Sequence, residues 1–283
     1  MYQQSILPED TMNLHQQLFS EHTPEDHLDI FWLGQAGFFF RTDAGLSLAV
    51  DPYLTDCGER IKNYKGFKRL TPKLIQPKDF CPRYVLSTHH HFDHLDYDAI
   101  PDIAAQGTSE FLAPESCCTL MHDEMGINSQ RLTALSPGDE LHLDRDLTLY
   151  VFDADHGAMA PEAIGLGIEY RGLRIYISGD TGFSPEIFRT VHKFQPHVGI
   201  LSVNGAFGNL TGTEGGQLAG LLNLSLAIPC HFGTFAEHGG DPASFISSVK
   251  EHAPTCTPFL MAQGERLRLN AYDYSDSQEQ ERL

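Results

Sequence analysis

The chain has 283 residues, and 38 acidic against 19 basic residues give it a formal net charge of −19 at pH 7. With 41% hydrophobic and 20% charged residues, its composition is that of a globular protein and excludes disorder, collagen and coiled coil. The negative charge argues against binding nucleic acid or an anionic membrane over a broad surface.

The chain begins with a polar, acidic stretch, residues 1–28, which we interpret as an N-terminal extension with a short helix around Met12–Phe19. It lacks the basic start and the apolar core of a signal or transit peptide. No uncharged stretch is apolar enough to form the ~20-residue helix that spans a bilayer. Six cysteines without paired spacing are expected to be reduced thiols. We therefore expect a cytoplasmic protein.

Short apolar runs separated by Gly and Asp predict β-strands from Asp29 on. In the first half, strands are expected at 30–33, 37–40, 46–50, 84–87 and 110–113, and helices at 97–106 and after Pro114. In the second half, strands are expected at 141–143, 147–152, 165–170, 173–178, 198–203, 227–230 and 259–262, and helices at 185–191, 214–222 and 242–252. This order favours one α/β domain over 29–269, with two mixed sheets and helices on their outer faces, and a polar tail, 270–283.

The segment directly after the strand 84–87 concentrates possible metal ligands, four within six residues. They are His89, His91, Asp93 and His94. In an extended segment side chains alternate, which would place His89, His91 and Asp93 on one side and His90 on the other. Imidazole and carboxylate are ligands for zinc, manganese and iron. We therefore expect a metal site here, with His90 outside it.

Ligand-type residues also follow three later strands, each beside a Gly or Pro that can bend the backbone: His156, Asp180 and His231. Taken singly, each fits a hydrogen-bonded polar residue in a turn equally well. Taken together with the histidine-rich segment, they predict that four strand ends meet at one metal site.

The motif H-x-H-x-D-H, a later His, a Gly-Asp after a strand and a final His in P-x-H resemble the metallo-β-lactamase superfamily. The resemblance implies an αββα sandwich with the site between the two sheets. It also implies the ligand sets: His89, His91 and His156 for one metal, Asp93, His94 and His231 for the second, and Asp180 bridging both.

Further details resemble the L-ascorbate-6-phosphate lactonase branch of that superfamily: Trp32-Leu33-Gly34, Val50-Asp51-Pro52, residues 66–70 and the stretch from Ile228 to Pro242. The chain is shorter than those lactonases and keeps His156, which favours a complete two-metal site. The resemblance implies a hydrolase of carbohydrate metabolism that opens a small, phosphorylated lactone or ester.

The expected cofactors are two divalent ions, manganese or zinc, with iron as a further option. Two such ions ~3.5–4 Å apart lower the pKa of a shared water toward ~7, so that a metal-bound hydroxide can attack the carbonyl. Asp93 is the expected catalytic proton carrier. Asp51 and Thr88 are expected to hold the metal-binding histidines, although a simple turn role for Asp51 fits the sequence equally well.

Candidate substrate contacts are fewer. Six of the 19 basic residues lie between positions 60 and 73, and Lys68 and Arg69 are the candidates to bind a substrate phosphate. A solvated loop without substrate contact is the alternative. Asn204, at the end of a strand, and His238 are further candidates, with an exposed loop histidine as the alternative for His238.

Three other functions share these ligands: a phosphodiesterase acting on a small phosphodiester, a thioesterase of the glyoxalase II kind, and a metal-binding protein without turnover. The net charge argues against a polynucleotide substrate for the first of these. The expected partner is a small anionic substrate, with neither nucleic acid nor membrane, and homo-oligomerisation is left open.

Overall fold

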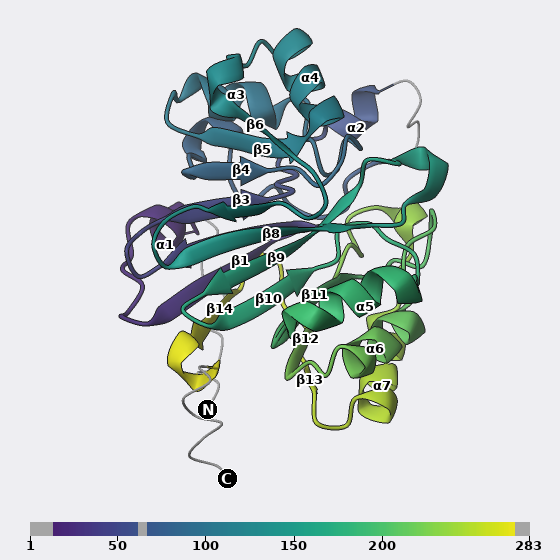
Figure 1. Cartoon of the computed structure of the whole chain (residues 1–283). Coiled ribbons are helices and arrows are strands. Elements are labelled where there is room, and N and C mark those ends of the chain that lie inside the picture. Colours follow the sequence, from purple (N-terminus) through teal and green to yellow (C-terminus); the bar gives the residue numbers. More distant parts are fainter. Residues whose placement is uncertain (1–13, 62–66, 275–283) are drawn as a thin grey trace. The chain divides into compact units, whose positions relative to one another are not determined.

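The computed structural model describes residues 14–61 and 67–274. The chain divides into two compact units, each built on one seven-stranded sheet (Figure 1). Unit 1 comprises the chain up to Leu135 with 233–237 and 262–269, and unit 2 comprises 136–232, 238–261 and the chain from Asn270. Part of the N-terminal extension (1–13), Lys62 and Lys65 of the basic segment, and residues 275–283 of the tail lie outside the described residues.

The sheet of unit 1 has the order β14-β1-β2-β3-β4-β5-β6, antiparallel from β1 to β3 and parallel from β3 to β6. Its strands are β1 (His27–Gly34), β2 (Gly37–Thr42), β3 (Ser47–Val50), β4 (Tyr84–Leu86), β5 (Glu110–Pro114), β6 (Leu132–Leu135) and β14 (Arg266–Asn270). Its helices are α1 (Leu14–Phe19), α2 (Cys57–Arg60), α3 (Ala99–Ala105) and α4 (Glu115–Asp123), with short 3-10 helices η3 (Pro77–Asp79) and η4 (Ser129–Arg131).

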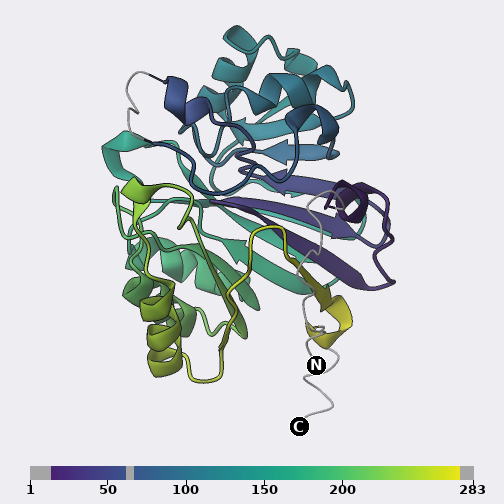
Figure 2. The ribbon, with the colours of Figure 1, turned by 180° about the vertical axis from the view of Figure 1, so that it is seen from behind.

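An apolar row crosses the sheet of unit 1 because its members pair in register and point to the same face. The row consists of Phe31, Phe39, Ala49, Val85 and Phe111. These residues share a buried core with Leu18 of α1 and Ile103 of α3. The ring of Phe19, at the end of α1, lies 5.4 Å from that of Phe39, and Figure 2 shows α1 against the first strands. The row therefore fixes the helices on this face.

The sheet of unit 2 has the order β13-β12-β11-β10-β9-β8-β7, with β10 to β13 parallel and β7 to β10 antiparallel. Its strands are β7 (Glu140–His142), β8 (Leu147–Asp153), β9 (Ile164–Tyr170), β10 (Leu173–Ile177), β11 (Val198–Ser202), β12 (Leu226–Cys230) and β13 (Thr257–Pro258). Its helices are α5 (Pro185–Phe194), α6 (Gly212–Leu221) and α7 (Pro242–His252), with 3-10 helices η5 (Gly157–Met159), η6 (Ala236–His238, only its last residue in unit 2) and η7 (Ala271–Tyr274).

Helices α5, α6 and α7 share one buried core with the sheet of unit 2, and Figure 1 shows them together on one side of β10 to β12. A capping box between Thr211 and Glu214 begins α6. Helices α6 and α7 pack so closely that a Cβ atom on Gly216 would lie 2.4 Å from the Cβ of Ser248. Only glycine fits there, which explains the glycine-rich face of α6.

The structure confirms the α/β class with two mixed sheets and helices, but β6 (Leu132–Leu135) and the short β13 (Thr257–Pro258) are strands that were not expected. Residues 259–262 do not form the expected strand, while Arg266–Asn270, which was not expected to be one, forms β14. Its alternating Leu side chains are buried, and Arg268 forms an ion pair with the buried Asp29. Two arginines make this segment look polar in the sequence, but in the fold acidic residues far away in the chain neutralise both of them. No helix within the described residues is both long and apolar enough to cross a bilayer.

Candidate metal centre

The first ligand cluster lies in unit 1, at the ends of two parallel neighbours, β3 and β4. It comprises His89, His91, Asp93 and His94. The segment after β4 is a series of bends and a turn, in which the backbone N–H groups of His94 and Leu95 donate to the carbonyl of His91 at 2.9 and 2.7 Å. The expected alternation of an extended segment is therefore wrong, because the chain turns back on itself here.

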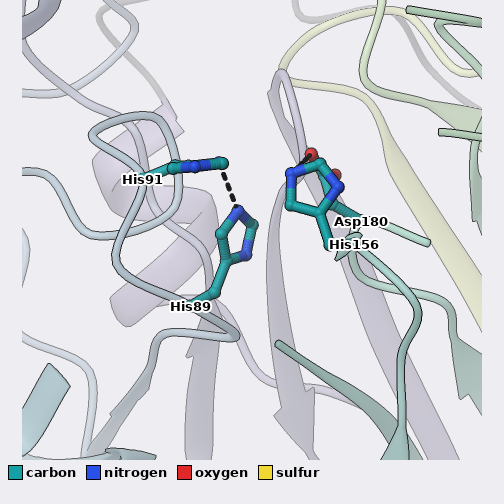
Figure 3. A group of neighbouring side chains, drawn as sticks. All are labelled: His89, His91, His156 and Asp180. Atoms are coloured by element: carbon teal, nitrogen blue, oxygen red, sulfur yellow. Dashed lines mark hydrogen bonds and ion pairs between the residues drawn. The ribbon is translucent and has the colours of Figure 1, made fainter. Parts of the chain in front are cut away.

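His89 and His91 direct ring nitrogens at each other (Figure 3). Nε2 of His89 lies 2.9 Å from Nδ1 of His91, and His89 is fully buried. Two nitrogens bound to one tetrahedral zinc at ~2.05 Å would be roughly 3.4 Å apart. The pair therefore has nearly the spacing that a shared cation requires.

Asp51 and Thr88 determine which nitrogen of each histidine is left to bind a metal. The Asp51 carboxylate accepts from the backbone N–H and the hydroxyl of Thr88, each at 2.7 Å. It also lies 2.7 Å from Nδ1 of His94, which must donate to it. Because the Thr88 hydroxyl proton is used, its oxygen, 3.1 Å from Nδ1 of His89, acts as the acceptor there. Both histidines thus keep the lone pair on Nε2.

His94 and Asp93 complete this cluster. Nε2 of His94 faces Oδ2 of Asp93 at 3.8 Å. Gln35, which the sequence did not single out, donates from Nε2 to the same oxygen at 2.8 Å. Gln35 occupies the tip of the turn between β1 and β2, where a positive φ favours glycine. A glutamine in such a position is the one signal that could have identified it.

The second ligand cluster lies in unit 2 and comprises His156, Asp180 and His231. Asp180 and His231 follow β10 and β12, whose parallel carboxyl ends lie at one edge of the sheet. His156 follows β8, which runs in the same direction as β10 because two antiparallel pairings separate them. The shared direction of β8, β10 and β12 thus brings together ligands that are distant in the sequence.

Asp180 is the centre of the second ligand cluster. Its Oδ1 lies 3.3 Å from Nε2 of His231, and its Oδ2 lies 3.7 Å from Nε2 of His156, the pair drawn in Figure 3. The side-chain N–H of Asn209 donates to Oδ2 at 2.7 Å. Asn209 is 29 positions away from Asp180, and no sequence pattern marks it. Each carboxylate oxygen of Asp180 thus lies near a different histidine, as expected of a carboxylate that could bind metal through both oxygens.

His238 is only 4% exposed, so the alternative of an exposed loop histidine is wrong. Its ring stacks on that of His231, with centroids 4.8 Å apart and an interplanar angle of 5°. The ring of Phe207, which is 45% exposed, also contacts the His238 ring, with centroids 5.5 Å apart. Within unit 2, stacking on His231 thus accounts for the burial of His238.

The other candidate substrate contacts, Lys68, Arg69 and Asn204, differ in their exposure and in their hydrogen bonds to the protein. Lys68 is exposed. Arg69 is buried: its guanidinium donates to the carbonyls of Tyr53 and Thr55, lies 4.2 Å from the Tyr53 ring centre and pairs with Asp56. Asn204, at the end of β11, is 4% exposed, and neither atom of its carboxamide has a hydrogen-bond partner in the described residues.

The donor set fits divalent metals. Both clusters offer buried imidazole and carboxylate atoms, which bind zinc, manganese and iron. Cys230, next to His231, directs its sulfur toward the Ser202 hydroxyl at 3.7 Å and so belongs to the interior of the unit. The backbone is strained at two positions beside these donors, with φ of 47° at Asp51 and 66° at His231. Such strain concentrates at functional sites.

Residues 51–232 match a family model described as Beta-lactamase superfamily domain. A UPF0173 metal-dependent hydrolase from Pyrobaculum islandicum is 27% identical over 86% of this chain and 100% of its own length. A protein from Salmonella gallinarum named Probable L-ascorbate-6-phosphate lactonase UlaG is 24% identical over 84% of this chain and 78% of its own.

Among solved structures, Igni18, a metallo hydrolase from Ignicoccus hospitalis, is similar with a TM-score of 0.69 at 22% identity. The likeness covers 86% of this chain and 98% of Igni18. At this identity it concerns the fold.

Proposed function

Because the chain belongs to the beta-lactamase superfamily domain family and has the metallo-β-lactamase fold, we propose a substrate for it. This metal-dependent hydrolase opens a small, phosphorylated lactone or ester. The proposal rests on one observation above all. Each unit carries a cluster of imidazole and carboxylate groups, all buried except the half-buried His91, at the carboxyl ends of its strands.

We propose that the protein holds two divalent metal ions, manganese or zinc, with the ligands that the sequence resemblance implies. In this assignment His89, His91 and His156 bind one ion, Asp93, His94 and His231 bind the other, and Asp180 binds both. When bound, such ions lower the pKa of water and polarise the attacked carbonyl or phosphoryl oxygen. The spacing of His89 to His91 and of His231 to Asp180 supports the assignment, because both are close to the separation of two ligands on one metal.

The protein's own groups then perform the remaining tasks. Asp93 carries a proton to the leaving oxygen, for which its carboxylate lies beside Nε2 of His94. Asp51 holds His94, and Thr88 holds His89, so that neither ring can rotate away from its ligand geometry. Because these partners are buried, the imidazole rings are preorganised before any substrate arrives.

Substrate contacts are proposed at three side chains. Lys68, exposed and positively charged, binds the phosphate, while Arg69 anchors the segment that presents it. The carboxamide of Asn204 offers a donor NH2 group and an acceptor oxygen for a polar group of the substrate, and neither has a hydrogen-bond partner among the described residues, which supports this. The ring of His238, stacked on His231, offers a further surface beside the metal ligands.

The lactonase assignment is supported by the similarity to the Salmonella protein named as an L-ascorbate-6-phosphate lactonase. It is tested by stripping the protein with a chelator, reloading it with Mn²⁺ or Zn²⁺, and measuring the opening of L-ascorbate 6-phosphate. Simple lactones, bis(p-nitrophenyl) phosphate and S-lactoylglutathione are assayed in parallel.

We expect metal-dependent opening of the phosphorylated lactone that is lost in Asp93→Ala. Cleavage of the phosphodiester alone would replace the lactonase by a phosphodiesterase at the same site, and cleavage of S-lactoylglutathione alone would replace it by a thioesterase. Bound metal without turnover of any substrate would contradict the proposed substrate class.

A further inference from the structure

Gln35 contacts an acidic member of the first ligand cluster from a distant part of the chain. Its Nε2 donates to Oδ2 of Asp93 at 2.8 Å, across 58 positions of sequence. Gln35 is fully buried, and Asp93 is 4% exposed. A charge-assisted hydrogen bond in such surroundings holds one carboxylate orientation strongly.

The backbone of Gln35 is unfavourable for glutamine. Residues 35 and 36 form the two-residue turn between β1 and β2, and Gln35 has a φ of +52°. That conformation favours glycine, and a longer side chain there is strained. Strained backbone of this kind clusters at functional sites, which directs attention to the Gln35 side chain.

The turn is held rigidly in place. The indole N–H of Trp32 donates to the Gln35 carbonyl at 3.0 Å. On the other side, the Gln263 side chain donates to the carbonyls of Leu33 and Pro72 at 3.0 and 3.1 Å. The turn also approaches Asp51 closely, because a Cβ atom on Gly37 would lie 3.0 Å from the Asp51 carbonyl. The carboxamide is therefore presented by a fixed support.

We propose that Gln35 is a positioning residue for Asp93, which keeps the carboxylate directed as a metal ligand. This inference rests on the proposed function, in which Asp93 binds metal and carries the proton. A carboxamide suits the task because it donates a hydrogen bond without adding a charge. The carboxylate charge of Asp93 is thus left for the cation, whereas an arginine or lysine at this place would compete with it.

The test measures zinc affinity, by competition between the apo protein and a chromophoric chelator, with Zn²⁺ alone as the probe. Gln35→Met keeps the length and burial of the side chain but removes the donor. Gln35→Gly removes the side chain and relieves the backbone. We expect both to bind zinc about 10–100-fold more weakly, and Gln35→Gly to retain the circular dichroism spectrum of the wild type.

Gln106→Met is the matched control, because Gln106 is exposed and, among the described residues, donates from its carboxamide only to the backbone carbonyls of Lys78 and Asp102, outside the turn and the ligand cluster. Its zinc affinity should equal that of the wild type. In an Asp93→Asn background, Gln35→Met should have no further effect, because it acts through Asp93. A purely structural role would give additive losses.

Two failures are distinguishable. If Asp93→Asn weakens zinc binding while both Gln35 variants bind zinc like the wild type, the positioning role is overturned and the proposed metal centre stands. If Asp93→Asn itself leaves zinc affinity unchanged, Asp93 is not a ligand, and the proposed centre and the role of Gln35 are both overturned.

Discussion

In unit 1, the carboxylate of Asp51 lies 2.7 Å from Nδ1 of His94, although 43 positions separate the two residues. The parallel pairing of β3 with β4 brings the ends of these strands together, and the backbone N–H of Asp51 donates to the carbonyl of Leu86 at 2.8 Å. The contact fixes the orientation of the His94 ring and leaves its other nitrogen for a metal.

Replacing Asp51 by asparagine should therefore weaken metal binding about 10–100-fold. Asparagine tolerates the positive φ of this position, so the backbone is retained. Its amide cannot accept from His94 and both groups of Thr88 as the carboxylate does. Zinc competition titrations check this, with the exposed Asp79→Asn as control. Equal affinities for the two variants would contradict the role of Asp51.

Removal of the metal should silence the protein without unfolding it. Each unit has its own apolar core of aromatic and aliphatic residues, so the fold does not depend on the ligand clusters alone. A cation that binds only the folded state raises the melting temperature by mass action. With a chelator in excess, we expect the circular dichroism spectrum at 25 °C to persist and the melting temperature to fall. Loss of the spectrum on chelation would show a structural role for the metal.

Substitution of Arg69 should affect the stability of the protein, whereas substitution of Lys68 should affect substrate binding. Arg69→Ala removes a buried guanidinium that bonds two carbonyls, and should destabilise the protein by about 2–4 kcal/mol in urea unfolding. Lys68→Ala, at an exposed position, should leave stability within about 0.5 kcal/mol and raise KM for a phosphorylated substrate. If Arg69→Ala raises KM at unchanged stability, Arg69 itself contacts the substrate.

Asn204→Ala should leave the protein as stable as the wild type or more so. A buried carboxamide that forms no hydrogen bond within 14–61 and 67–274 carries a desolvation cost of about 1–3 kcal/mol, which the substitution removes at the expense of a small cavity. KM should rise, because a polar group of the substrate loses its partner. A marked fall in the urea midpoint, with KM unchanged, would show that Asn204 is structural.

Asp29 should make the stability of unit 1 depend on pH in the acid range. Burial acts to raise the pKa of this carboxyl, but hydrogen bonds from Arg268, Thr23 and Arg41 outweigh it and hold the pKa below its ordinary value. The stabilisation is therefore complete above the unfolded value of about 3.9 and is lost as the pH falls through the lower folded value.

Asp29→Asn should cost roughly 3–5 kcal/mol at pH 7, because two arginines lose their buried partner. The difference from the wild type should shrink as the pH falls from the unfolded pKa of about 3.9 through the lower folded pKa of Asp29. Urea unfolding of both proteins from pH 7 to pH 2.5 measures it. A difference that stays constant over this range would contradict the role of ionised Asp29.

Local patterns along the chain were enough to predict the α/β class, most strands and the ligand-type residues. Apolar runs alternate with turns, and a His or Asp follows each strand that ends at a cluster. The same local logic failed at β14, where Arg266 and Arg268 lower the hydrophobicity of a strand that distant acids neutralise.

The fold, and not any local pattern, sets which groups hydrogen-bond to the expected ligands. Gln35 reaches Asp93, and Asn209 reaches Asp180, through contacts between segments that no sequence period connects. It also decided that Arg69 is buried against Tyr53 and that His238 stacks on His231. The physical reason is that strand identity depends on near neighbours in the chain. Hydrogen bonding, burial and charge pairing of a side chain depend instead on whatever the fold places beside it.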